Sequence, residues 1–268
     1  MSKVTFKDLV IRTWLNTKSI CRYTFRVTKA GKFDVPPEYK QVFFDYFQTD
    51  FREKWDTGSE QGVPPYHANY HIQWYDNDQI QLVNGGVQFS AVVKPKYFPE
   101  INETIPNAIG IMRTKDAWKY GIFFFNTKMP SGTWLWQALW LSGRYNWPPE
   151  IDLLEGYSKN TIDYNKNRDQ ESNVHISDGD GGSIVAGAVK HRLPNKVTEE
   201  FIDYAIWWEP TFIKFYYNGY LVRHITDPVM LKGMFEEQRI IIGTGIQEGF
   251  NKDNITPMVV SQVKVFQK

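Results

Sequence analysis

The sequence contains a single cysteine, Cys21, in 268 residues, so no disulfide can form within the chain. It has no apolar run of about 18 or more residues, which excludes a membrane-spanning helix. Lysine plus arginine number 31 and aspartate plus glutamate 30, so neither sign of charge dominates. This balance gives neither the basic field that binds nucleic acid nor a polybasic arm for a lipid surface. We therefore expect no nucleic-acid partner and no membrane partner.

The first residues, MSKVTFKDLVIRTW, lack the apolar h-region and the small-residue cleavage site of a secretory signal. Either the chain is not exported by the usual route or a leader has been removed, so its compartment stays unassigned. We expect residues 1–38 to form an N-terminal extension of unknown role. Residues 39–268 are expected to form a single monomeric domain, because no low-complexity linker divides them and a chain of this length buries a core without staples.

Aromatic residues are abundant: 10 Trp, 15 Tyr and 18 Phe make up 16% of the chain. Such rings build cores, but surplus tryptophan can also line a groove for a flat, partly apolar ligand such as a sugar ring. A large aromatic core with no such ligand is the alternative. Helical periodicity is scarce. It is best in Asp227–Gln238, where Asp227 can cap the first turn and Pro228 fits the first helical position.

Most of the chain has the composition of β-strands. Asn84-Gly85-Gly86 and Asn218-Gly219 predict hairpins within Gln79–Val93 and Phe212–Ile225, because tight hairpin turns need residues that accept positive φ. Further β-branched and aromatic segments between turn residues predict strands at Tyr120–Met129, Thr133–Gly143, Ser172–Ser177, Phe201–Glu209, Arg239–Gly245 and Met258–Phe266. About ten or more short strands with few helices predict an all-β fold, a jelly-roll sandwich of two antiparallel sheets.

The segment EIDLLE, Glu150–Glu155, places three carboxylates in an otherwise apolar run. Alternate residues of a strand share a face, so Glu150 and Asp152 point the same way and Glu155 the opposite way. One extra residue, a β-bulge near Leu153-Leu154, would return Glu155 to the acidic face. Three acids this close cannot all ionise freely, so one pKa should rise, as a general acid requires. A pair of carboxyl groups of this kind is what glycoside hydrolysis needs.

Two other interpretations of these acids stay open. They could form a solvated acidic strand face, although Asp and Glu are poor strand formers and aligned like charges repel. They could also bind a metal, although no glycine-centred calcium-loop spacing accompanies them. The nearby segment Ser177–Gly182, SDGDGG, predicts a turn rather than a calcium loop.

The segment WPPEIDLLEGY resembles the Glu-x-Asp-x-x-Glu signature of the family-sixteen glycoside hydrolases, in the longer form carried by laminarinase-like members. Other stretches of the chain resemble the family in the same order: GIFFFNTKMPSGTWLWQALWLSG, NVHIS, DYAIWWEPTFIKFYYNGYLVR and VVSQVKVFQ. The resemblance covers most of residues 39–268. It implies a β-jelly roll with an open substrate cleft, in a mostly extracellular family of retaining endo-hydrolases of β-glucans and β-galactans.

Carried over residue by residue, the resemblance assigns Glu150 as the nucleophile, Glu155 as the acid/base, and Asp152 as the group that tunes both. Glu155 would protonate the leaving oxygen while Glu150 attacks the anomeric carbon, and water would then release the sugar. The expected function is that of a retaining endo-β-glycosidase acting on β-1,3- or mixed β-1,3/1,4-glucan. The alternatives are hydrolysis of a galactan of the agar, porphyran or carrageenan type, transglycosylation, and a non-catalytic carbohydrate-binding or virion surface protein.

Trp136, Trp140 and Trp147 are the predicted sugar platform, since residues 136 and 140 share a face of a strand and Trp147 adjoins the acids. Core packing is the alternative for each ring. His175 falls where the family has a histidine strand and is a candidate substrate contact or a structural residue. Ser261 stands where many members have an aspartate that helps to bind calcium, so we expect no metal and no cofactor. The approach to the acids is also shorter than the family's usual Trp-Pro-x-x-Gly-Glu.

Overall fold

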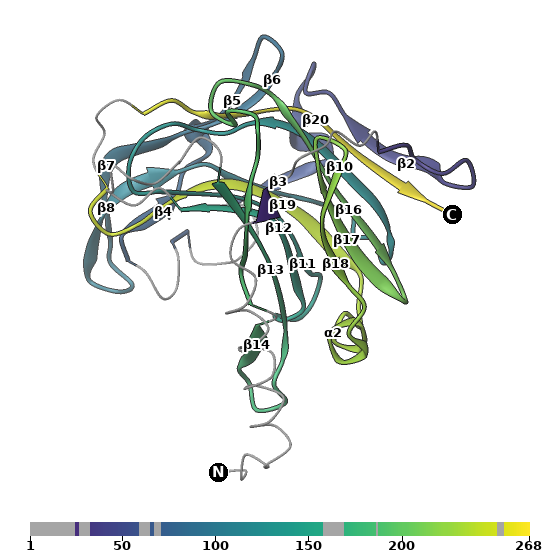
Figure 1. Ribbon diagram of the computed structural model, residues 1–268. Coiled ribbons are helices and arrows are strands. Elements are labelled where there is room, and N and C mark those ends of the chain that lie inside the picture. The colour runs from purple at the N-terminus through teal and green to yellow at the C-terminus, as the bar shows by residue number, and fades with distance from the viewer. Residues whose placement is uncertain are drawn as a thin grey trace.

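The structure is a computed structural model that describes residues 25–26, 33–58, 65–66, 71–157, 169–185, 187–250 and 255–268. Two large sheets pack against each other, and a small third sheet lies at the left of the molecule in Figure 1. Almost all pairings within the large sheets are antiparallel; the short β1–β15 pair is parallel. The predicted all-β jelly-roll sandwich is therefore confirmed. In the described part of the chain, no helix is long and apolar enough to span a membrane.

The strand order within each sheet brings distant segments side by side. The nine-stranded sheet runs β1 (Phe25–Arg26), β15 (Val189–Arg192), β13 (Asp169–Ser177), β12 (Glu150–Tyr157), β11 (Leu135–Gly143), β19 (Gln238–Ile246), β9 (Ile111–Thr114) and β3 (Trp55–Thr57), with β14 (Ser183–Val185) also beside β13. The eight-stranded sheet runs β18 (Tyr220–Ile225), β17 (Phe212–Tyr217), β16 (Ile202–Glu209), β10 (Gly121–Lys128), β20 (Met258–Gln267), β6 (Gly86–Phe89) and β5 (Ile80–Val83), with β2 (Lys40–Asp45) also beside β20. The third sheet runs β4 (Gln73–Tyr75), β8 (Glu103–Ile109) and β7 (Ala91–Phe98).

Both hairpins predicted from the Asn-Gly turns are present. β17 and β18 join through Asn218, with φ 47°, and Gly219, with φ 76°. β5 and β6 pair across the turn that contains Gly85, with φ 91°. These left-handed conformations are the ones that asparagine and glycine tolerate best, so the turn residues fix the hairpins locally.

The predicted helix is shorter than its sequence pattern. α2 spans Pro228–Gly233 and begins at Asp227, whose carboxylate accepts hydrogen bonds from the next backbone N–H groups, Val229 at 2.9 Å among them. A Cβ atom at Gly233 would lie 2.3 Å from Ile176, so glycine allows the chain to approach β13 closely. The extension of the helix to Gln238 was wrong, because that residue already opens β19.

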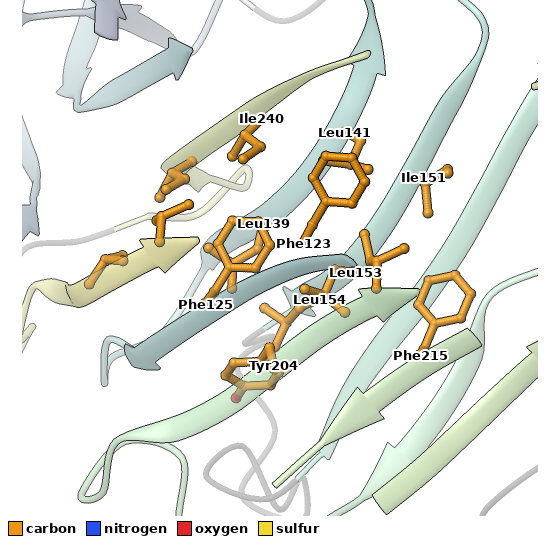
Figure 2. Close-up of a cluster of buried hydrophobic side chains, with 14 of the residues drawn as sticks. Phe123, Phe125, Leu139, Leu141, Ile151, Leu153, Leu154, Tyr204, Phe215 and Ile240 are labelled. Atoms are coloured by element: carbon orange, nitrogen blue, oxygen red, sulfur yellow. The ribbon is translucent and has the colours of Figure 1, made fainter. Parts of the chain in front are cut away.

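The core lies between the two large sheets and takes alternate residues from their strands. Along β11, the buried Leu135, Leu139 and Leu141 alternate with half-buried Trp136 and Trp140. Figure 2 shows the core side chains of β11, β12 and β19, from the nine-stranded sheet, meeting those of β10, β16 and β17, from the eight-stranded sheet; the labelled members are Phe123, Phe125, Leu139, Leu141, Ile151, Leu153, Leu154, Tyr204, Phe215 and Ile240. The nine-stranded sheet therefore has one face in the core and an opposite face that carries the tryptophans.

Most of the predicted N-terminal extension lies outside the described residues. Of the described part, Phe25–Arg26 forms β1 beside β15, and Phe33 packs against β16 and β17 from the side away from the core. The ring of Phe33 lies 4.4 Å from that of Tyr216 and 6.1 Å from that of Trp207, measured between centroids. Tyr39 accepts a hydrogen bond from the Trp207 indole at 2.9 Å. This contact extends the aromatic packing beyond the sandwich itself.

Candidate active site

The hexapeptide Glu150–Glu155 forms most of β12, in the middle of the nine-stranded sheet. On the β11 side, Glu150, Asp152 and Glu155 pair with Ser142, Trp140 and Ala138. The register shifts between Leu139 and Trp140, because Leu153 has no partner there. The pairing with β13 is irregular over the same stretch, between Asp152 and Glu155. The shift falls where the sequence predicts an extra residue.

The register shift separates the hexapeptide into two sets of side chains. Ile151, Leu153 and Leu154 are fully buried and belong to the core cluster, as Figure 2 shows. The acids share the other face with Trp136 and Trp140, because directly paired residues of antiparallel strands point to the same side. We call this side of the sheet, with Glu150, Asp152, Glu155, Trp136 and Trp140, the acidic face.

A histidine from β13 reaches the first two acids. His175 pairs with Glu150 in the strand register, and its Nε2 lies 3.2 Å from Asp152 Oδ2 and 3.7 Å from Glu150 Oε1. The sequence motif suggested His175 only by analogy, and the structure places it among the acids. Asn173, two residues earlier on the same strand, was missed; its Nδ2 lies 3.3 Å from the same ring nitrogen. The period-two spacing from His175 was the signal that could have found it.

Two tryptophans donate hydrogen bonds to the two glutamates. The Trp136 indole Nε1 lies 3.0 Å from Glu155 Oε1, and the Trp147 indole Nε1 lies 3.1 Å from Glu150 Oε2. The Trp147 side chain is 58% exposed, and its ring centroid lies 6.0 Å from that of His175. Trp140 is half-buried and pairs with Asp152. None of these three tryptophans belongs to the buried core, so the core alternative is wrong for them.

The environment of Glu150 and Asp152 favours their protonated forms. Burial is the main cause that raises the pKa of Glu150 to about 8, and the nearby Asp152 carboxylate raises it further. His175 and the Trp147 indole oppose this rise. Burial also raises the pKa of Asp152 well above its usual range, with the charge of Glu155 adding to it. From the sequence we predicted that one of the three acids has a raised pKa, as a general acid requires. In the structure the pKa of Glu150 is raised, although the resemblance assigns this residue as the nucleophile.

Glu150, Asp152 and His175 on the acidic face could hold a cation, since one ligand atom from each lies within 4.8 Å of the others.

The sequence also drew attention to two other possible calcium-binding positions, the SDGDGG loop and Ser261. In both, the side-chain oxygens take part in hydrogen bonds within the protein. Asp178 in the SDGDGG loop accepts hydrogen bonds from the backbone N–H groups of Asp180 and Gly182, each at 2.9 Å, which confirms the predicted turn. Ser261 donates its hydroxyl to the side-chain oxygen of Asn126, so a neutral, hydrogen-bonded group stands at that position.

The fold and the acidic face together define a class of protein, the jelly-roll glycoside hydrolases. The family model of the glycosyl hydrolases family 16 matches residues 75–259, more than half of the chain. The chain belongs to this family, and it is therefore a glycoside hydrolase by family.

The relatives of this chain include enzymes named for two different polysaccharide substrates, β-glucan and porphyran. A beta-glucanase of Rhodothermus marinus is 28% identical over 219 residues, covering 74% of this chain and 71% of that protein. Beta-porphyranase B of Zobellia galactanivorans is 26% identical over 166 residues, covering 56% of each. The crystal structure of porphyranase B from the same organism superposes with a TM-score of 0.72 at 21% identity, over 89% of this chain and 97% of that one. A Thermotoga petrophila laminarinase domain gives 0.71 at 20% identity, over 86% and 98%.

Proposed function

We propose that this protein is a retaining endo-β-glycosidase that cleaves a β-1,3- or mixed β-1,3/1,4-glucan by double displacement. The observation that carries the proposal is the register shift at Leu153, which gathers Glu150, Asp152 and Glu155 on one face of the sheet. A regular strand would direct Glu155 into the core, where it could not meet the same sugar as Glu150. The family relationship supports the hydrolase class, and the beta-glucanase relative supports a glucan substrate.

In the proposed reaction Glu150 attacks the anomeric carbon while Glu155 protonates the departing glycosidic oxygen. Water then attacks the glycosyl–enzyme ester, and Glu155 takes its proton as the base. The indole N–H of Trp136 holds Glu155, and that of Trp147 holds Glu150, so each carboxyl has a fixed orientation before the sugar arrives. The exposed ring of Trp147 offers a flat apolar surface beside the bond to be cut.

The raised pKa of Glu150 adds a proton step to this scheme. At neutral pH burial keeps a proton on Glu150, and a nucleophilic carboxylate must lose it before attack. His175 Nε2, 3.7 Å from Glu150 Oε1, and Asp152 are the groups within reach to accept it. In this proposal, the Glu150–Asp152–His175 cluster therefore shares one proton and leaves Glu150 charged when the substrate binds.

The two glutamates can be told apart by azide rescue on a β-aryl glycoside. In Glu150→Ala, azide attacks the anomeric carbon directly and displaces the aryloxide, so the product is the α-glycosyl azide. In Glu155→Ala, azide attacks the ester on Glu150 from the other side and yields the β-glycosyl azide. The reverse pair of products would show that Glu155 is the nucleophile and Glu150 the acid/base. The test is needed because a raised pKa, as found for Glu150, is also what an acid/base requires.

A galactan of the porphyran, agar or carrageenan type is the second candidate substrate. The specific support is that a porphyranase appears both among the sequence relatives and among the structures of the same fold. Reducing-sugar release should be measured on laminarin, mixed-linkage glucan, agarose, porphyran and carrageenan, for wild type and Glu150→Gln. We expect release from one of the glucans by wild type only, with β-anomers as the first products by NMR. Equal release by both proteins, or α-anomers first, would refute the proposal.

A further inference from the structure

Leu153 is the residue of the hexapeptide that pairs with neither neighbouring strand. The other five each have a partner on β11, and Glu150, Ile151, Asp152 and Glu155 also have one on β13. The leucine side chain is fully buried in the core (Figure 2). A backbone carbonyl that is taken from water at such a break in the ladder needs a hydrogen bond from another source.

The opposite sheet supplies that hydrogen bond. Tyr217, the last residue of β17, donates its hydroxyl to the backbone oxygen of Leu153 at 2.6 Å. Tyr217 itself is fully buried. Its ring packs edge-to-face against Tyr204 and His191, with centroids 5.0 Å and 5.3 Å away, so the position of the hydroxyl is fixed by its neighbours.

A second donor from the same sheet reaches the strand across from the break. Ser172 lies on β13 between Asn173 and Glu171, the residues that pair with Asp152 and Glu155, and so stands opposite the shifted segment. Arg223 of β18 donates from Nη1 to the backbone oxygen of Ser172 at 2.7 Å. The arginine is only 6% exposed, and its Nη2 also donates to the backbone oxygen of Gly187 at 3.1 Å.

We propose that Tyr217 and Arg223 are positioning residues, which hold the register shift of β12 from the core side and thereby set where Glu155 stands relative to Glu150 and Asp152. Neither side chain lies on the acidic face; both donate to backbone oxygens, and the charge of Arg223 also favours the ionised form of Asp152. The consequence for catalysis rests on the proposed function. Without the two donors, buried carbonyls at the break lose their partners, and the strand gains by sliding toward regular pairing, which turns Glu155 away from the other acids.

Tyr217→Phe tests the first donor, because it removes the hydroxyl and keeps the ring. The matched control is Tyr204→Phe, a neighbouring tyrosine in the same core. Its buried hydroxyl has no hydrogen-bond partner among the described residues. Native-state hydrogen exchange should show the backbone N–H groups of residues 153–155 exchanging about ten-fold faster in Tyr217→Phe, as expected for one lost buried hydrogen bond. The same groups should be unchanged in Tyr204→Phe.

Kinetics distinguish positioning from general stability. In Tyr217→Phe we expect kcat on the polysaccharide to fall at least about ten-fold with KM within about two-fold, at a temperature where both variants are fully folded. A purely structural role would lower the melting temperature and leave kcat unchanged, which would overturn the proposal. Unaltered exchange at residues 153–155, or an equal effect of Tyr204→Phe, would overturn it as well.

Arg223→Lys tests the second donor, since it keeps the positive charge and loses the forked guanidinium. We expect faster exchange at residues 171–173, and no change there would remove Arg223 from the proposal. Exchange also separates this inference from the proposed function. If wild type releases no sugar from any polysaccharide, the proposed function fails, whereas the exchange pattern still decides whether the two side chains hold the register shift.

Discussion

The indole Nε1 of Trp147 lies 3.1 Å from Glu150 Oε2, although the Trp147 side chain is 58% exposed. One edge of this ring is thus hydrogen-bonded to a half-buried acid, while much of the rest of the ring faces solvent. A residue placed in this way can fix the carboxyl group and contact a sugar at the same time. The N–H group also lowers the pKa of Glu150, against the effect of burial.

Trp147→Phe should move the activity profile of the enzyme to higher pH. The substitution keeps an aromatic ring but removes the donor that favours ionised Glu150, so the pKa of Glu150 rises further. The rate constant kcat/KM on an activated aryl β-glycoside, measured against pH, should show its ascending limb displaced toward alkaline pH. Trp140→Phe is the matched control, because Trp140 lies opposite Asp152 in the strand register and, among the described residues, only the Trp147 indole donates to Glu150. An equal displacement in both variants would contradict this role.

Trp136→Ala should weaken oligosaccharide binding without unfolding the domain. The ring is half-buried on the acidic face and lies outside the core cluster. Loss of one stacking ring is expected to weaken binding on the order of ten-fold. Calorimetric titration with an inactive Glu150→Gln background should show this loss, while the thermal transition remains. Disappearance of the cooperative transition would mean that Trp136 supports the fold instead.

Glu155→Ala should separate substrates by their need for an acid. On a polysaccharide, whose leaving group must be protonated, the rate should fall on the order of 10²–10⁴-fold. On an aryl glycoside with a good leaving group, glycosylation needs little protonation and the fall should be far smaller. Rates on the two substrates, measured side by side for wild type and variant, check this. A uniform loss on both would count against Glu155 as the acid.

Glu150→Gln should make the protein more stable than wild type in alkaline solution. The folded-state pKa of Glu150, about 8, exceeds its ordinary value of 4.5, so the folded chain binds this proton more tightly than the unfolded chain. Its contribution is therefore fully present below about pH 4.5 and is lost as pH rises toward 8. The amide cannot ionise and escapes this loss, which is on the order of a few kcal/mol.

Denaturant unfolding of wild type and Glu150→Gln from pH 5 to 9 checks this sign. The difference in the free energy of unfolding should grow with pH and level off above about 8. Glu248→Gln, a change at an exposed glutamate, is the control for the loss of one acid. A difference that shrinks with rising pH would show that Glu150 is stabilised as the anion.

The features predicted from the sequence are those with local causes. Asn218-Gly219 specifies its hairpin through two backbone conformations, and Asp227 with Pro228 specifies the start of α2. The acidic face could be predicted because strand alternation applied to Glu150–Glu155 leaves an odd residue, and one extra residue resolves it. Each of these inferences needs only neighbouring residues.

The features that were missed depend on contacts far along the chain or on very short elements. β3 and β4 have three residues each, too few to show alternation. The hydrogen bond between Tyr217 and Leu153 joins residues 64 positions apart, and no local sequence pattern predicts it. The same holds for the pKa of Glu150, which depends on how deeply the finished sheet encloses the carboxyl group.

Every side chain of the β12 hexapeptide belongs either to the core or to the acidic face. Ile151, Leu153 and Leu154 pack in the core, and Glu150, Asp152 and Glu155 lie on the acidic face. An insertion or deletion here would exchange the two sets of side chains, so any new specificity must arise elsewhere. Engineers who want this scaffold to accept a different sugar should leave this strand untouched and vary the connections at the ends of its neighbours.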